Sequence, residues 1–356
     1  DIFLGGDEFR TGLDAEADYW GAYLGAAFGL TDRLMLETSA RYNRAEIDLD
    51  DQLGTALDGS HAFDRLNPAV ELTYDMPTAG GDLTLFGRYA ESSRTPTPAE
   101  LSCADETQPC RFPNAFVADP PLKQVVAKSW EGGITGSEGF GGGLLDWSAT
   151  LFTATNEDDI IFVSSGPVIG SGYFRNAGDT RRQGLESWAR WENDAWTLTA
   201  SYSTIEATFE APATLLAEDN PNADDDGEIF VQPGDRLPLI PRHGGQVSAQ
   251  WRFMENLSAN VSALAASDRR LRGDEAGDGQ TLDGFVRFDA GLAATLGRRL
   301  NAFVRVENIL DEEYATFGTY GDVEELYLQE APDAEDPRFF TPAAPRAVFA
   351  GVRLKL

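Results

Sequence analysis

The sequence predicts an all-β fold, an antiparallel transmembrane β-barrel that occupies the whole of residues 1–356, and three observations carry this prediction. Apolar and polar residues alternate along most of the chain, which is the pattern of strands with one apolar and one polar face. Tight turns and long polar connections follow one another in strict alternation. Helical periodicity is hard to find anywhere in the chain.

The alternation predicts about 14 strands. Within 195–204, for example, Trp196, Leu198 and Ala200 interleave with threonine and serine. The segments 246–253 and 285–296 show the same period of two. In chain order, the expected strands are 1–11, 17–30, 33–47, 63–76, 82–92, 124–137, 143–156, 179–192, 195–209, 243–254, 257–267, 284–296, 299–310 and 344–356.

The connections between these strands separate a membrane barrel from a soluble β-sandwich. Long polar loops are expected near 48–62, 93–122, 157–178, 210–241, 267–284 and 311–342, with tight turns between them. A sandwich rarely combines strands of about ten residues or more with a long loop after every second strand, whereas an outer-membrane barrel does. Closure of the barrel also pairs every backbone group that faces hydrocarbon. A soluble β-rich binding protein remains the alternative from the residues alone.

Charge excludes several classes of function. The chain carries 59 acidic and 28 basic residues, a formal charge of −31. This charge argues against nucleic-acid binding and against binding of anionic lipid through a polybasic segment. The acid is concentrated in the expected loops: 210–235 holds eight carboxylates and 311–337 holds ten, and neither segment has a basic residue. We therefore expect these segments to be solvated. No run of 18 apolar residues predicts a membrane-spanning helix.

Two cysteines, Cys103 and Cys110, lie in one polar, proline-rich segment and predict a local disulfide, which requires an oxidising compartment. Two free thiols are the alternative. No Ser/His/Asp spacing, phosphate-binding loop or dinucleotide glycine pattern is present. We therefore expect a protein that is not an enzyme and has no catalytic residue.

One acidic stretch partly imitates a calcium loop. Asn222, Asp224, Asp226 and Glu228 occupy alternate positions, as oxygen ligands do in such loops. Pro233 stands where the closing bidentate glutamate would fall. A solvated acidic loop is the plainer interpretation, and a Ca²⁺ site on an outer loop is the other. No further cofactor is indicated.

Six stretches taken together carry a family resemblance. The segment 174–186 is the closest match, to the pattern N-x-G-x-x-x-x-x-G-x-E, and 305–317 matches V-x-N-L-F-D-x-x-Y. Each motif is short, but their order and spacing over about 270 residues resemble the C-terminal barrel of TonB-dependent outer-membrane receptors. The six stretches are 89–101 (YAESSRTPTPAEL), 122–134 (LKQVVAKSWEGGI), 150–162 (TLFTATNEDDIIF), 174–186 (FRNAGDTRRQGLE), 237–242 (LPLIPR) and 305–317 (RVENILDEEYATF).

The resemblance implies a larger architecture than the chain contains. Members of the family have a 22-stranded barrel, a plug domain inside it and a TonB-binding box, so the resemblance implies a C-terminal barrel portion without the plug. A complete 14-stranded barrel is the alternative. The implied location is the bacterial outer membrane, in contact with lipid and lipopolysaccharide, with the long loops extracellular.

The function that the resemblance implies is energised uptake of a scarce ligand, most often a ferric siderophore, driven by the TonB–ExbB–ExbD system through the plug. A passive, porin-like or structural barrel is the alternative. Arg94, Arg252, Arg287 and Arg305 are the candidate contacts for a plug or an anionic ligand. Salt bridges to neighbouring carboxylates are the plainer role for these arginines.

Overall fold

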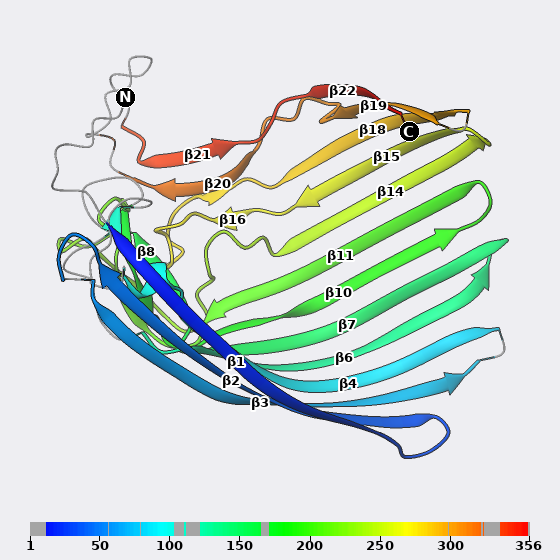
Figure 1. The fold of residues 1–356 in the computed structure, drawn as a ribbon. Helices are drawn as coiled ribbons and strands as arrows, with labels where there is room; N and C mark the ends of the chain where they lie inside the picture. Colours follow the sequence, from blue (N-terminus) through cyan, green and yellow to red (C-terminus); the bar gives the residue numbers. More distant parts are fainter. Residues whose placement is uncertain are drawn as a thin grey trace.

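One antiparallel sheet of 13 strands makes up most of the molecule (Figure 1). The computed structural model describes residues 12–354, apart from residues 56, 79, 103–109, 112–121, 165–170, 298, 322 and 324–334. The strands are β1 (Leu13–Gly29), β2 (Leu34–Asp51), β3 (Gly59–Pro77), β4 (Gly81–Arg94), β6 (Val125–Phe140), β7 (Gly143–Glu157), β10 (Thr180–Glu192), β11 (Trp196–Phe209), β14 (His243–Met254), β15 (Leu257–Ala266), β18 (Phe285–Leu296), β19 (Leu300–Glu307) and β22 (Ala347–Leu354).

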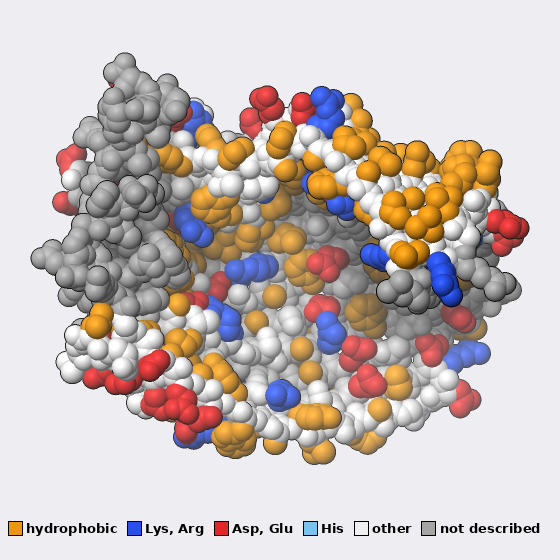
Figure 2. Space-filling view, turned by 45° about the horizontal axis from the view of Figure 1, so that its top comes forward, with side chains coloured by type: hydrophobic (Ala, Val, Ile, Leu, Met, Phe, Trp, Pro, Cys, Tyr) orange, Lys and Arg blue, Asp and Glu red, His pale blue; other side chains and the backbone are white. Residues whose placement is uncertain are grey.

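These strands lie in chain order across the sheet, and every neighbouring pair is antiparallel. All but one of the expected strands are therefore confirmed; the expected strand 1–11 falls outside the described residues. Within the part of the chain that the structure describes, no helix is both long and apolar enough to cross a membrane. The sheet curves around a hollow, with β1 and β22 at its two edges (Figures 1 and 2).

The two ends of the sheet differ in their connections. Short turns join alternate pairs of strands at one end, for instance between β6 and β7, and long connections join the others at the opposite end. Short and long connections alternate as expected, but the loop expected at 48–62 is shorter, because β2 continues to Asp51 and β3 begins at Gly59. The long connections carry a short helix, α1 (Pro98–Leu101), and small sheets built from β5 (Cys110–Arg111), β8 (Ile160–Ser164), β9 (Ser171–Asn176), β12 (Ala213–Leu216), β13 (Glu228–Val231), β16 (Arg269–Arg270), β17 (Thr281–Leu282), β20 (Ala315–Tyr320) and β21 (Arg338–Pro342).

Strand register assigns the side chains to two faces, because neighbours in an antiparallel ladder point the same way. Val261, Ala290 and Val306 pair across three strands, and Val261 is 55% exposed. Exposed apolar side chains of this kind cover the outward face. Charged partners fill the opposite face, which lines the hollow. One apolar and one polar face is the arrangement expected of a barrel wall between lipid and a wet interior.

The segment 174–186 contains a turn and the first part of β10, where the backbones of β10 and β11 lie close together at Gly184. Asn176 Nδ2 donates to the carbonyls of Asp158 (2.6 Å) and Lys123 (3.2 Å), which ties two long connections together. Gly178 has a φ of +86°, a conformation that glycine adopts at little cost. A Cβ on Gly184 would lie 1.8 Å from the Thr204 carbonyl oxygen. The motif therefore consists of residues that the backbone geometry requires.

The turn after β19 explains the acidic stretch that follows the strand. Asn308 is 1% exposed, has a φ of +52°, and accepts a hydrogen bond from Glu312 N at its Oδ1. Its own N–H donates to Asp289 Oδ1 at 2.9 Å. Asp311 Oδ1 accepts from Arg346 N at 2.8 Å, which ties the start of the last long connection to its end. Asn308 and Asp311 therefore stabilise this turn locally.

Candidate functional site

The hollow of the sheet is lined by side chains of both charges (Figure 2). Arg88 on β4 lies between two carboxylates on the adjacent strands: its Nη2 is 2.5 Å from Glu131, and its Nη1 is 3.9 Å from Glu71. The three residues face one another directly in the strand register. The hollow is therefore a surface of paired charges, suited to polar contacts with a second protein element or a solute.

Arg252, Arg287 and Arg305 lie on this inward face in the strand register. Arg287 bonds Asp289 at 2.9 Å, and Arg305 bonds Glu307 at 2.9 Å while its guanidinium lies 5.1 Å from the ring of Phe349. Arg252 lies near the short-turn end, where its Nη1 donates to the Asp194 carbonyl at 3.1 Å. Each has a partner within the sheet or its turns, so a ligand role for these arginines stays a prediction.

Arg94 ends β4 and joins a helix cap. Its Nη1 lies 2.7 Å from Glu100 Oε2. Glu100 also accepts from the Thr97 N–H, and Thr97 accepts from Glu100 N, so the two residues form a capping box that begins α1. The carboxylate partner of Arg94 is therefore structural.

The long connections build a cap that has its own apolar core. Phe209, Leu215 and Val231 are buried in one cluster with Tyr173 from β9. A second cluster joins Ile47 on β2 to Leu101, with further contacts from Ile160 and Phe174. The β8–β9 hairpin therefore contacts both sides of the hollow at the long-loop end. The expectation that 210–235 is simply a solvated loop is wrong for Leu215 and Val231, because both are buried against Phe209 and Tyr173.

A buried acidic pair lies in the connection between β15 and β18. Asp274 is fully buried, and its Oδ1 accepts from Gly279 N at 3.0 Å while Arg270 lies 3.7 Å from its Oδ2. Glu275 is 6% exposed and accepts from Gly273 N at 3.1 Å. Burial raises the pKa of Glu275 to about 7. Asn220, from the neighbouring connection, donates to the Gly273 carbonyl at 2.6 Å and holds this loop in place.

Arg272 lies where three long connections meet. Its guanidinium carbon is 5.4 Å from the ring of Phe162 on β8 and 5.3 Å from the ring of Phe317 on β20. Its backbone N–H donates to Gly318 O at 3.0 Å, and its carbonyl accepts from Tyr320 N at 3.1 Å. Burial lowers the pKa of the Arg272 guanidinium.

The suggested calcium stretch forms a hairpin turn between β12 and β13. Asp224 Oδ1 accepts from the backbone N–H groups of Asp226 (3.0 Å) and Glu228 (2.9 Å), and the N–H of Asn222 donates to Asn220 Oδ1. Among the described residues, no group of three or more His, Cys, Asp or Glu side chains is arranged to hold a metal ion. The Ca²⁺ interpretation stays a prediction, and the geometry assigns Asp224 a role in the turn.

The expected disulfide cannot be placed in the fold. Cys103 lies outside the described residues, and only the backbone of Cys110 is described, as part of β5. The pairing of these two cysteines stays a prediction from their spacing.

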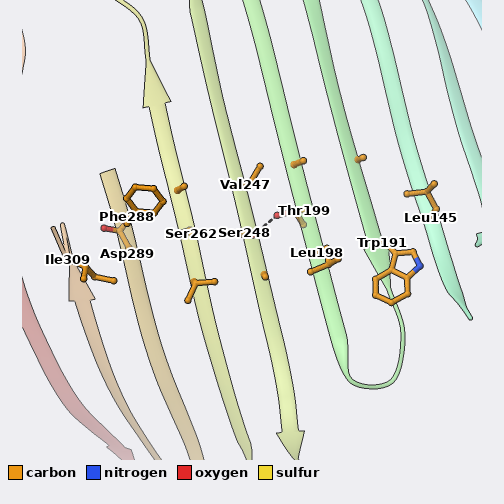
Figure 3. Close-up of a pocket in the computed structure, with 15 residues that line it drawn as sticks. Leu145, Trp191, Leu198, Thr199, Val247, Ser248, Ser262, Phe288, Asp289 and Ile309 are labelled. Atoms are coloured by element: carbon orange, nitrogen blue, oxygen red, sulfur yellow. Dashed lines mark hydrogen bonds between the residues drawn. The ribbon is translucent and has the colours of Figure 1, made fainter. Parts of the chain in front are cut away.

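The outward face has a shallow apolar hollow of about 560 Å³ across β7, β10, β11, β14, β15 and β18 (Figure 3). Leu145, Trp191, Leu198, Val247 and Phe288 come from adjacent strands around it, with alanines between them. A dashed line in the figure marks the 2.6 Å hydrogen bond between Thr199 and Ser248. The polar residues in its lining are engaged with protein partners: Thr199 and Ser248 bond each other, and Asp289 bonds Arg287. An outward surface that is mainly apolar is the kind expected of a barrel wall facing lipid.

Sequence reasoning missed the group formed by Arg272, Asp274 and Glu275. Their segment reads as an ordinary polar loop, and its partners Phe162 and Phe317 lie far away in the sequence. A weak signal was present, since Leu271 and Leu282 are apolar residues inside a loop, and both are buried against Tyr320.

Comparisons with known proteins agree with this geometry. The family profile described as "TonB dependent receptor-like, beta-barrel" matches residues 4–309. A pesticin receptor of Yersinia enterocolitica is 27% identical over 175 residues, which is 48% of this chain and 23% of that protein. The chain therefore spans about a quarter of the length of this curated relative.

Solved structures share the fold at low sequence identity. The copper transporter OprC superposes with a TM-score of 0.69 at 18% identity, over 96% of this chain and 50% of that one. The ferric yersiniabactin uptake receptor FyuA from Yersinia pestis gives 0.64 at 16% identity, over 96% and 46%. The siderophore receptor PiuA from Acinetobacter baumannii gives 0.66 at 16% identity, over 96% and 44%. This chain is therefore similar in fold to about half of each of these barrels.

Proposed function

Because the chain belongs to the TonB-dependent receptor family, whose β-barrel profile it matches over residues 4–309, we propose that it forms part of the wall of an outer-membrane transporter that takes up a ferric siderophore. Barrels of this family reside in the bacterial outer membrane, and the family consists of receptors and transporters. In the proposal, the long loops face the outside and capture the ligand, and further strands and a plug complete the protein.

The observation that carries the proposal is the division of the sheet into an apolar outward face and a charged hollow capped at one end. The outward face offers large apolar side chains such as Leu151 (65% exposed) and Val352 (70% exposed) to the surroundings. The hollow offers paired charges such as Arg88 with Glu131. A plug inside the barrel would find hydrogen-bonding partners along this inner wall, and TonB would act on the plug.

The loop cap favours a receptor over a passive pore. Tyr173 and Phe209 are almost fully buried, so the β8–β9 hairpin is packed against the wall at the mouth of the hollow. An unobstructed channel has no need of an apolar core at its mouth, whereas a receptor needs rigid loops to hold a ligand.

The siderophore assignment is supported by similarity in fold to FyuA and PiuA, both named for iron–siderophore uptake, although OprC is named for copper. The test is uptake of radioactive iron by iron-starved cells that express the full-length gene, supplied with a panel of ferric siderophores. Copper uptake is measured in parallel. We expect uptake of at least one ferric chelate, abolished by deletion of tonB.

Two outcomes would contradict the proposal. Uptake that persists unchanged without TonB would identify a passive barrel. Transport of copper with no ferric chelate accepted would replace the cargo while leaving the energised mechanism in place.

A further inference from the structure

We infer that Arg272 is an oxyanion-binding residue of the outer loops and contacts a carboxylate of the transported ligand. The inference rests on the proposed function, since it names the chemistry of the ligand that the loop cap captures. It concerns one side chain at the meeting point of three connections, those from β7 to β10, from β15 to β18 and from β19 to β22.

The first argument is the environment of the guanidinium. Phe162 and Phe317 lie within cation–π distance, at 5.4 and 5.3 Å. The rings interact with the charge, but they do not replace the strong acceptors that five N–H donors require. Among the described residues, no acceptor lies within hydrogen-bond distance of the guanidinium and no carboxylate lies within ion-pair distance of it. A guanidinium without a protein acceptor can bind a carboxylate through two parallel hydrogen bonds.

The second argument is the contrast with other loop arginines. Arg338 also lies over a phenylalanine, Phe340 at 5.9 Å, but Asp336 bonds it at 2.5 Å. Arg270, two residues before Arg272, faces Asp274 at 3.7 Å. In a chain with a net charge of −31, carboxylates are abundant, and yet none of the described ones pairs with Arg272.

The third argument is the neighbouring carboxyl group. Glu275 is the acidic residue whose charge acts on Arg272, and burial raises the pKa of Glu275 to about 7. Near neutral pH a large fraction of Glu275 is therefore protonated and does not cancel the positive charge. The site retains positive potential for an arriving anion.

The fourth argument is rigidity. The backbone of Arg272 is hydrogen-bonded on both sides, from its N–H to Gly318 O and from Tyr320 N to its carbonyl. Leu271, beside it, is fully buried with Leu282 and Tyr320. The guanidinium is therefore attached to a fixed backbone, which lowers the entropic cost of binding.

The test is a binding titration of citrate, with and without Fe(III), into the full-length receptor in detergent, read by calorimetry. The variants are Arg272→Gln, Arg272→Lys and the matched control Arg338→Gln, which removes an arginine that already has a carboxylate partner. We expect wild type and Arg338→Gln to bind alike. Arg272→Gln should bind about 10- to 100-fold more weakly, the range for loss of hydrogen bonds to a charged group, and Arg272→Lys should be intermediate.

Heat-modifiable gel mobility checks that each variant assembles, and Arg272→Lys serves as the informative variant if Arg272→Gln does not fold. The inference is overturned if wild type binds neither form of citrate, if Arg272→Gln binds within twofold of wild type, or if Arg338→Gln loses as much affinity as Arg272→Gln. TonB-dependent uptake that does not change in Arg272→Gln would overturn the inference and leave the proposed function intact. Citrate binding through Arg272 without any iron uptake would support the inference and contradict the proposed function.

Discussion

Glu275 should make the docking of the 267–284 connection dependent on pH. The carboxyl is buried, and its pKa rises from 4.5 to about 7 in the docked loop. When the loop undocks, the carboxyl returns to water and to its ordinary pKa. The docked state therefore binds the proton more tightly, and rising pH favours the undocked state.

The rise in the pKa of Glu275 sets the size of the change in docking free energy. A rise from 4.5 to about 7 corresponds to about 3 kcal/mol, since one pKa unit is about 1.4 kcal/mol. This stabilisation of the docked loop is fully present below pH 4.5. It is lost progressively as the pH rises to about 7 and changes little above that value. The docking equilibrium should therefore shift by a factor of about 300 across this window.

Hydrogen exchange of the peptides from 267–284 measures this shift, once the intrinsic pH dependence of exchange is removed. Wild type should lose protection as pH rises from 4.5 to 7, and Glu275→Gln, which mimics the protonated carboxyl, should lose clearly less. The slope that remains in the variant comes from Asp274, whose pKa burial also raises. Glu313→Gln is the matched control, because Glu313 is exposed in a neighbouring loop. A flat wild-type profile, or a slope in Glu275→Gln as steep as that of wild type, would contradict this explanation.

Three further predictions concern assembly and the cap. Gly184→Ala should lower the yield of heat-modifiable barrel, because its Cβ would meet the Thr204 carbonyl oxygen at 1.8 Å; Gly87→Ala, with nothing within 4 Å, is the control and should assemble normally. Phe209→Ala should destabilise the cap by about 3–5 kcal/mol, seen as faster proteolysis of the long connections while the strands stay intact; cleavage at the wild-type rate would contradict the packing. Cys103→Ser should leave assembly unchanged and increase proteolysis only within 93–122, whereas lost heat-modifiable mobility would argue against this.

Much of the fold could be predicted from the sequence because strand periodicity is a local property. The alternation along 285–296 places Val286 and Phe288 on one face in any antiparallel sheet, and the register confirms it. The motif residues Asn176 and Gly184 could be recognised by their spacing. Their geometric reasons, a side chain bonded to two connections and a strand contact too close for a Cβ, required the structure.

The candidate site could be predicted only in part. Arg252, Arg287 and Arg305 were correctly placed on the inward face, since alternation alone decides that. Some of their partners could not be predicted from the sequence. Tyr314, for example, accepts a hydrogen bond from Arg287 at 3.5 Å but lies in the connection after β19. The same limit hid Arg272, whose aromatic neighbours come from two other loops.

The strands, the face of each residue and the alternation of turns and loops therefore follow from local sequence, because a period of two and turn composition act over a few neighbouring residues. Which loops fold together depends on the folded molecule as a whole, since apolar burial joins residues that the chain brings together from distant positions. Phe209 meets Tyr173, and Arg272 meets Phe162, because the curved sheet sets their connections at one end of the hollow. The long connections therefore share an apolar core, and the connection from β15 to β18 places a buried carboxyl, Glu275, close to Arg272.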